Sequence, residues 1–311
     1  MDNITHTLCG MALGEAFFRE KHGRRAVTIS AWASNLPDID VLVLLTRDPG
    51  AVILRRSFGH SLLLLPVWAA GMSWVFKKRY PDMAFRDVYG IVALNAGVHL
   101  LFDLINSFGV QLLWPLSVRR WEWSCTFIVD LFLTACLAAP HLVRLSRAWR
   151  PRLKQASRAG LAAAGLYLAA SLGLHERAES LLRAAEPGAS FVYAFPEPFG
   201  PLRWHGVARY PGVWRQRLIR PLAGAADPAA EVPTDDASPG AAAAEASPFG
   251  RRLLTFFKAP VWSAEPEPGG TLVRVRDLRF SPLTLAHGGS FRYAFDARPD
   301  GSAVPRGVRI W

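Results

Sequence analysis

His99 and Asp103 are the clearest candidates for chemistry in this sequence. They stand four residues apart in an apolar stretch, residues 95–114, that has the character of a helix. Because four residues make just over one helical turn, both side chains lie on one face and could hold one ion. An imidazole and a carboxylate in apolar surroundings indicate a bound metal or, as the alternative, a hydrogen bond between the two side chains.

Further histidine and aspartate residues could complete a metal site. The predicted metal ligands are His6, Asp38, Asp40, His60, His99 and Asp103. Three imidazoles and three carboxylates suit a divalent ion such as Zn²⁺, Mn²⁺ or Fe²⁺, and the set is large enough for one or two ions. Pro37 disfavours a continuous helix just before Asp38 and Asp40, so both carboxylates can turn toward one centre.

Three residues of this region are predicted to take part in catalysis. A carboxylate that the metal does not need, Asp38 or Asp40, could act as a general base. Arg56 precedes His60 by four residues and could hold a phosphate or carboxylate of a substrate. The alternatives are that Asp38 only caps the helix after Pro37 and that Arg56 is an interfacial residue.

Apolar segments close to membrane-spanning length fill the first 176 residues. Hydrophobic residues make up 51% of the 311-residue chain, and the mean hydropathy is +0.15. A bilayer core needs about 20 apolar residues per helix, with a range of ~17–25. The sequence therefore predicts a mainly α membrane bundle of about five to six membrane helices. The predicted helices span residues 4–18, 26–45, 61–76, 88–105, 127–143 and 159–174.

Lys and Arg residues lie in short blocks between these segments. Fourteen are in the loops 19–25, 77–87 and 144–158, and five are in the loops 46–60 and 107–126. By the positive-inside rule the first three loops face the cytoplasm and both chain ends lie outside. The net charge of +11 thus indicates membrane topology, and no nucleic-acid partner is expected.

This topology brings all six predicted ligands to the outer side of the membrane. The topology rests on Lys and Arg alone, so the shared depth of the His and Asp residues is independent support for one site. Ionisable residues inside a membrane are costly and are functional candidates by default. Glu15 lies on the face opposite His6 and stands four residues before Arg19, where we expect a local ion pair.

The chain changes character after the last apolar segment. Residues 187–311 are predicted to form a small β-rich extracytoplasmic domain, because stretches such as TLVRVRDLRF and SFRYAFDA alternate apolar and polar residues. Residues 221–248, rich in Ala, Pro, Asp and Glu, are predicted to be a disordered loop within it. The helical membrane domain with the metal site then covers residues 1–176.

Several motifs of the first 135 residues occur together in one known family. They are MDNITHTLCG, SNLPDIDVL, RRSFGHSLLL, GVHLLFDLINSFGVQLLWPLS and FIVD. In this order they resemble the uncharacterised family of predicted inner-membrane metal-dependent hydrolases that includes the YdjM-like proteins. The pieces FFKAP and VRDLRF look like the soluble tail of its longer members. By position, the resemblance implies the same six metal residues. Relatives often have His-Arg-Gly-x-Thr-His-Ser where this chain has RRSFGHS at residues 55–61, so a ligand at position 55 is missing here.

The sequence thus predicts a membrane-embedded metal-dependent hydrolase of the bacterial inner membrane. A metal-activated water would attack a lipid or lipid-linked ester or phosphoester, because the site lies at the depth of the lipid. The partners expected are the membrane lipid bilayer and a lipid-linked substrate. The alternative is a non-enzymatic membrane protein with a structural metal site or a role in metal or proton transport.

Overall fold

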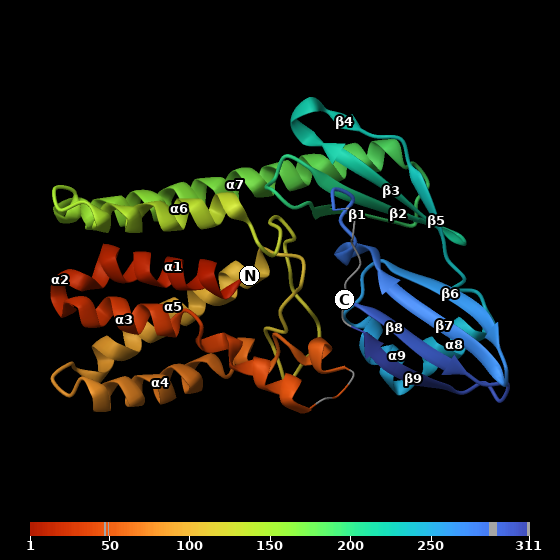
Figure 1. Cartoon of the computed structure of the whole chain (residues 1–311), viewed down its shortest axis with the longest axis horizontal. Helices are drawn as coiled ribbons and strands as arrows, with labels where there is room; N and C mark the ends of the chain where they lie inside the picture. The colour runs from red at the N-terminus through yellow and green to blue at the C-terminus, as the bar shows by residue number, and fades with distance from the viewer. Residues whose placement is uncertain (47, 49, 286–290, 310–311) are drawn as a thin grey trace. The chain divides into compact units, whose positions relative to one another are not determined.

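The computed structural model describes residues 1–46, 48, 50–285 and 291–309. It divides into two compact units, which are labelled by element in Figure 1. The first unit comprises Met1–Leu45 and Arg55–Leu172, and the second comprises Thr46–Leu54 and the chain from Gly173 onward. The long helix α7 (Leu153–Ala185) begins in the first unit and ends in the second.

The first unit is helical. Its elements are α1 (Asn3–Leu13), the π-helical turn η1 (Gly14–Phe18), α2 (Arg19–His22), α3 (Arg24–Ala33), the 3₁₀ helices η2 (Leu36–Thr46) and η4 (Phe58–His60), α4 (Leu65–Arg79), α5 (Phe85–Leu104), α6 (Leu131–Leu142), and the 3₁₀ turns η5 (Val143–Leu145) and η6 (Arg150–Arg152). The Asp2 side chain caps α1 by accepting a hydrogen bond from the Thr5 amide. Gly23, at φ 66°, allows the sharp turn between α2 and α3.

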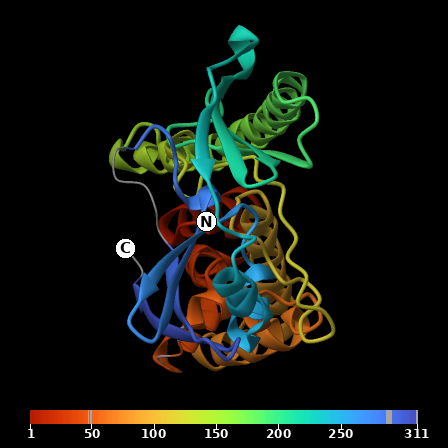
Figure 2. The ribbon, with the colours of Figure 1, turned by 90° about the vertical axis from the view of Figure 1, so that its right-hand side faces the viewer.

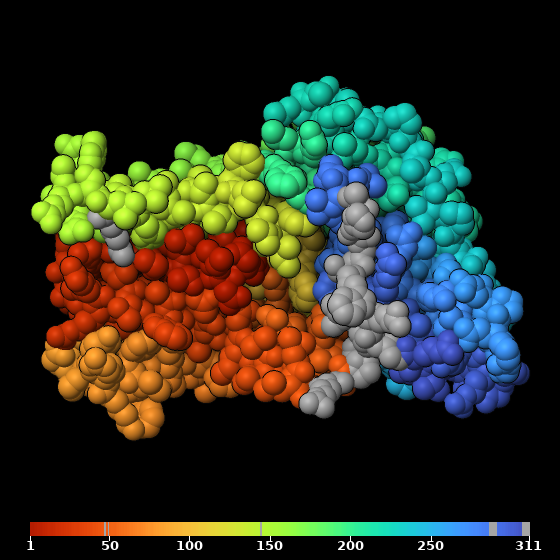
Figure 3. Space-filling model, viewed as in Figure 1, coloured from red at the N-terminus to blue at the C-terminus, as the bar shows by residue number. Residues whose placement is uncertain are grey.

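Close packing of α1 on α3 organises this unit. A Cβ at Gly10 would lie 2.5 Å from the Ser30 backbone oxygen, so only glycine permits this approach. A buried cluster from α3, α4 and α5, which includes Ile29 and Ile91, fills the space on the other side of α3. Figure 3 shows the surface of α1 to α3 (red) between those of α6 (yellow-green) and α4 (orange). The packing brings α1, η2 and α5 together around the candidate site.

The predicted bundle of five to six membrane helices is wrong. Within the described residues α5 is the one helix that is long and apolar enough to cross a membrane, and half of its apolar window is buried inside the protein. A second span results only if Ala51–His60 and Leu65–Arg79, which meet at 74°, are counted as one broken span. The helical character of the N-terminal region is as predicted.

Breaks within the apolar segments explain why the structure has fewer membrane helices than predicted. The run 26–45 stops being an α-helix at Ala33 and continues as the 3₁₀ helix η2, because Pro37 cannot extend an α-helix. The 10 residues of α3 make a helix about 15 Å long, roughly half of the ~30 Å bilayer core. The 12-residue α6, which contains Pro140, is also too short.

The second unit is rich in antiparallel sheet, as predicted for the C-terminal part. Its elements are η3 (Ala51–Leu54), β1 (Phe191–Pro196), β2 (Trp204–Tyr210), β3 (Val213–Arg220), η7 (Pro221–Ala223), β4 (Ala225–Ala226), β5 (Ala230–Pro233), α8 (Pro239–Ala246), α9 (Pro248–Leu254), β6 (Pro260–Glu267), β7 (Gly270–Asp277), η8 (Leu278–Phe280), β8 (Arg292–Ala297) and β9 (Ala303–Arg309). One sheet has the order β1-β2-β3-β4 with β5 also paired to β3, and the other has the order β6-β7-β8-β9. Figure 2 shows the second sheet in blue.

Residues 221–248, predicted to be disordered, instead contain short ordered elements. α8 packs on the β6–β9 sheet and buries Ala241 and Ala244. Small side chains let the helix approach closely, since a Cβ at Gly240 would lie 2.9 Å from a Val273 methyl. Ser238 caps the helix through a hydrogen bond to the Ala241 amide. The Ala-rich composition therefore serves helix–sheet packing rather than disorder.

Candidate metal centre

His60, His99 and Asp103 meet in the interior of the first unit. Their side chains are 0–1% exposed. His60 Nε2 lies 3.0 Å from Asp103 Oδ2 and 3.2 Å from His99 Nε2. His99 Nε2 lies 3.7 Å from the same carboxylate oxygen. Three potential ligand atoms from two distant segments therefore point at one small volume.

Hydrogen bonds on the far side of each ring fix which nitrogen carries the proton. His99 Nδ1 lies 2.6 Å from the Ser34 backbone oxygen, and His60 Nδ1 lies 2.8 Å from Asp40 Oδ2. Both partners can only accept a hydrogen bond, so each Nδ1 is the donor. In neutral rings the two Nε2 atoms then present lone pairs toward Asp103.

Two lone pairs and a carboxylate oxygen at this spacing repel one another unless a proton or a cation lies among them. A tetrahedral ion with ligands at ~2.0–2.2 Å separates neighbouring ligand atoms by roughly 3.3–3.6 Å. The observed separations of 3.0–3.7 Å bracket this range. A histidine that donates through Nδ1 to a carboxylate or a backbone oxygen is also the usual arrangement of a metal-bound imidazole. The donor set therefore fits a divalent metal.

Asp38 could supply a fourth ligand atom. One atom each from Asp38, His60, His99 and Asp103 lie within 4.8 Å of one another, and this group could hold a metal ion. The Asp38 side chain is 12% exposed, more than the other three. It accepts hydrogen bonds from Asn3 Nδ2 at 3.0 Å and Arg55 Nη2 at 3.1 Å. The edge with Asp38 is thus where solvent comes closest to the centre.

His6 and Asp40 lie beside this group rather than in it. His6 stacks on His99 with ring centroids 3.7 Å apart, and its Nε2 lies 3.2 Å from Asp103 Oδ1. Burial lowers the pKa of His6 and outweighs the opposing effect of Asp103. Asp40 is fully buried and orients His60, while its Oδ2 also accepts the Ser57 amide at 3.0 Å. The structure places all six predicted residues together, four in the group and two flanking it.

Arg56 is buried against the site instead of facing an opening. It is 4% exposed, and its Nε lies 2.7 Å from Asp103 Oδ2. Its Nη1 donates to Asn106 Oδ1 at 2.7 Å, and its guanidinium stacks on Phe108. The Met1 amino group also contacts Asp103. In this structure Arg56 therefore neutralises Asp103, and the sequence-based role of holding a substrate anion does not match its position.

A close backbone approach brings His60 to its partners. A Cβ at Gly59 would lie 2.0 Å from the Pro37 backbone oxygen. Glycine thus lets the 3₁₀ turn Phe58–His60 lie directly on the turn that carries Asp40. On α5 the four-residue spacing of His99 and Asp103 places both side chains on the inner face, as their helical positions require.

Sequence reasoning missed several contributors. Arg55 bridges two carboxylates, with Nη2 at 3.1 Å from Asp38 Oδ1 and Nε at 3.4 Å from Asp40 Oδ1. Asn106 and the Ser34 carbonyl complete the hydrogen bonding of Arg56 and His99. Only Arg55, which directly precedes Arg56 and lies five residues before His60, offered a signal in the sequence. Backbone carbonyls carry none.

Comparisons with known proteins concern mainly this helical part. The model of the YdjM inner membrane protein family matches residues 1–178. The chain is also similar to the uncharacterized protein YfhP of Bacillus subtilis (strain 168), with 27% identity over 128 residues. That stretch is 39% of this chain and 39% of the relative, so the chain spans well under half of the relative's length. No solved structure matches.

Proposed function

The chain belongs to the YdjM inner membrane protein family, and on that premise we propose that it is a metal-dependent hydrolase with its metal held by Asp38, His60, His99 and Asp103. The observation that carries the proposal is the convergence of the Nε2 atoms of His60 and His99 on Asp103 Oδ2 in a buried site. Nitrogen and oxygen donors without sulfur favour Zn²⁺, Mn²⁺ or Fe²⁺. Such an ion supplies Lewis acidity and hydroxide at neutral pH.

One ion fits these residues better than two. A second ion would need carboxylates of its own, and Asp40 is the one predicted carboxylate that the first ion leaves over. Asp40 is fully buried, already accepts hydrogen bonds from His60 Nδ1 and the Ser57 amide, and has Arg55 Nε 3.4 Å from its Oδ1. A guanidinium stays protonated in proteins, so it competes with a second cation at every working pH.

Asp38, Asp40 and Arg55 would have separate roles in the reaction. Asp38, at the exposed edge, would accept a proton on the carboxylate oxygen that does not bind the metal. Asp40 holds the His60 ring in its orientation and is a positioning residue rather than a base, because it is fully buried. Arg55, whose side chain is 26% exposed, would bind an anionic group of the substrate in place of the buried Arg56.

A lipid or lipid-linked ester or phosphoester is the substrate class that we propose. The family places the protein at the inner membrane. Large apolar side chains of the first unit are exposed, among them Ile4 at 69%, Val67 at 62% and Leu116 at 81%. Large contiguous patches of exposed apolar surface mark contact with lipid or with another protein. A substrate that partitions into lipid would reach such a surface first.

Hydrolysis by the purified full-length chain tests the proposal. We expect zinc- or manganese-dependent release of nitrophenol from a chromogenic phosphodiester or ester in detergent. The activity should be lost in His99→Ala and kept in His22→Ala, which changes a histidine outside the site. Metal-independent hydrolysis, or equal activity in both variants, would reject the proposal.

A structural or transport metal site is the second candidate, and the burial of the centre favours it. Three of the four ligands are 0–1% exposed, which leaves a substrate little access except beside Asp38. In that case the protein binds metal but hydrolyses nothing, and removing the metal lowers only its stability or its metal transport. Activity and thermal stability measured on the same metal-free sample separate the two functions.

A further inference from the structure

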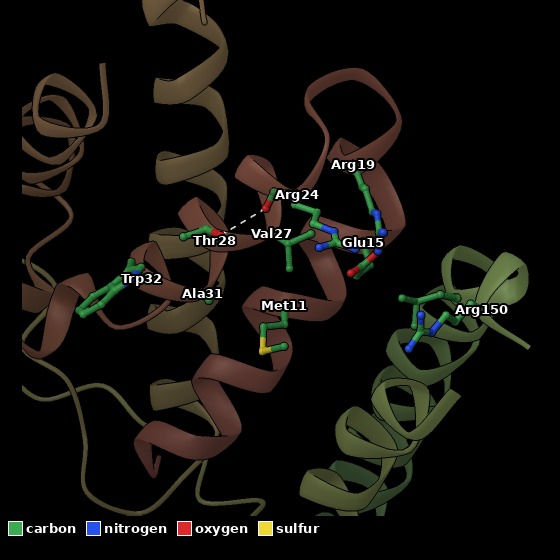
Figure 4. A pocket seen from close by; sticks show the side chains of 10 residues that line it. Met11, Glu15, Arg19, Arg24, Val27, Thr28, Ala31, Trp32 and Arg150 are labelled. Carbon is green, nitrogen blue, oxygen red and sulfur yellow. Dashed lines mark hydrogen bonds and ion pairs between the residues drawn. The ribbon is translucent and has the colours of Figure 1, made fainter. Parts of the chain in front are cut away.

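One pocket of the first unit shares no residue with the metal centre. It has a volume of about 490 Å³ and is lined by side chains from α1, η1, α2, α3, η6 and the start of α7. Figure 4 shows Arg19, Arg24 and Arg150 around Glu15 at one end and Trp32 at the other. The pocket thus has a charged end and an apolar wall.

The charged end is positive. Three arginines and one glutamate line the pocket. Glu15, whose side chain is 2% exposed, pairs with Arg19 at 2.5 Å, so the predicted local ion pair is confirmed. Arg24 forms no ion pair with any residue that the structure describes. The lining therefore carries an excess of two positive charges, which an anion could neutralise.

A π-helical turn forms part of the charged end of the pocket. Residues Gly14–Phe18 form a π-helical turn between α1 and α2, and such turns are rare and frequent at functional sites. A Cβ at Gly14 would lie 2.8 Å from the Val27 Cα, so the turn packs tightly on α3. The turn carries Glu15 into the pocket wall, where its carboxylate holds Arg19 in place.

The apolar wall and rim resemble the surroundings of a membrane interface. Val27 and Leu153 line the wall together with Trp32, which is 66% exposed. Phe17, two residues from Glu15 in the chain, is 56% exposed, and Trp149, which directly precedes Arg150, is 53% exposed. Exposed tryptophan and phenylalanine beside arginine are typical of the region of the lipid headgroups.

We propose that this pocket binds the anionic headgroup of a membrane phospholipid. Arg24 and Arg150 would hold the phosphate, because guanidinium groups match phosphate oxygens in pairs. The glycerol and upper acyl region would lie against Trp32 and Val27. Clusters of basic residues at a membrane surface attract anionic lipids. A free phosphate would make no contact with the apolar wall, whereas a phospholipid would. The volume of the pocket lies within the ~300–1,000 Å³ that is typical of ligand pockets.

Native mass spectrometry of the full-length chain in mild detergent tests this site. Phosphatidylglycerol, phosphatidylcholine and inorganic phosphate are added separately. We expect the protein to retain phosphatidylglycerol in preference to phosphatidylcholine. The double variant Arg24→Gln/Arg150→Gln should bind it about 30-fold more weakly, since each arginine near a lipid surface contributes about one factor of five.

The matched control is Lys78→Gln/Arg79→Gln, which removes the same charge from the end of α4, outside the pocket. It should retain the lipid like the wild type. An equal loss in both double variants would mean general attraction to a basic surface and would overturn the proposal. Equal retention of both lipids, or displacement of the lipid by equimolar phosphate, would overturn it as well. Circular dichroism checks that both variants are folded.

Discussion

The variant Gly59→Ala tests how the metal centre is assembled. An added Cβ would lie 2.0 Å from the Pro37 backbone oxygen, whereas ordinary contacts begin at 3.4 Å. The obstacle is backbone rather than a flexible side chain, so the turn that carries His60 must move by about 1 Å or more. Metal–ligand distances tolerate only about ±0.2 Å. The shift therefore removes His60 from its place opposite His99.

The expected effect is a loss of metal affinity. The same movement breaks the hydrogen bond from His60 Nδ1 to Asp40 Oδ2, now 2.8 Å. Loss of such an orienting bond alone typically weakens metal binding by about 10–100-fold. We expect the zinc Kd of Gly59→Ala to rise at least about tenfold. Competition with a fluorescent chelator, on the full-length chain in detergent, measures this directly.

Gly97→Ala is the matched control. It adds the same methyl group two residues before His99, at a position where a Cβ would meet nothing within 4 Å. Its zinc affinity should equal that of the wild type, and α5 should gain up to about 1 kcal/mol because alanine favours the helix over glycine. If Gly59→Ala binds zinc as tightly as Gly97→Ala, the close approach does not position His60 and the reasoning is refuted.

Three further predictions concern the centre and the β-rich unit. Asp40→Ala should weaken zinc binding about 10–100-fold by releasing the His60 ring, and an unchanged Kd in the same titration would contradict this role. Chelation should lower the melting temperature of the wild type by several degrees, because a metal that binds only the native state stabilises it. The melting temperature of His99→Ala should not change. Equal shifts of both proteins in calorimetry would argue against a specific site. In the β-rich unit burial lowers the pKa of His205 to about 4. The native state therefore resists protonation, and stability present above the unfolded pKa of about 6.5 is lost as the pH falls toward 4, by about 3 kcal/mol. Denaturant unfolding at pH 7 and pH 4 should show this loss in the wild type and not in His205→Gln.

The elements of the metal centre that follow local rules could be predicted from the sequence. The pairing of His99 with Asp103 follows from helix geometry, and the turn at Pro37 follows from its fixed φ. The alternation of apolar and polar residues predicted the β-rich C-terminal part. In each case the signal lies within a few neighbouring residues.

Features that depend on tertiary packing could not be predicted. The number of membrane helices was overestimated because hydropathy does not show how much of an apolar run is α-helical; within the predicted helix 127–143, only the 12 residues of α6 are. The different roles of Asp38 and Asp40 depend on which one is buried against His60. Arg55 and Arg56 are adjacent in the chain, yet Arg55 pairs with Asp38 at the exposed edge of the site and Arg56 is buried against Asp103.

The metal content of the purified full-length chain tests the central claim most directly. Elemental analysis gives the number of ions per chain for the wild type and for Asp103→Ala. The control is Asp82→Asn, which changes an exposed carboxylate outside the metal centre. We predict close to one equivalent of zinc, manganese or iron in the wild type and in Asp82→Asn, and almost none in Asp103→Ala. A wild-type protein without metal above background, even after incubation with each ion, would contradict the account.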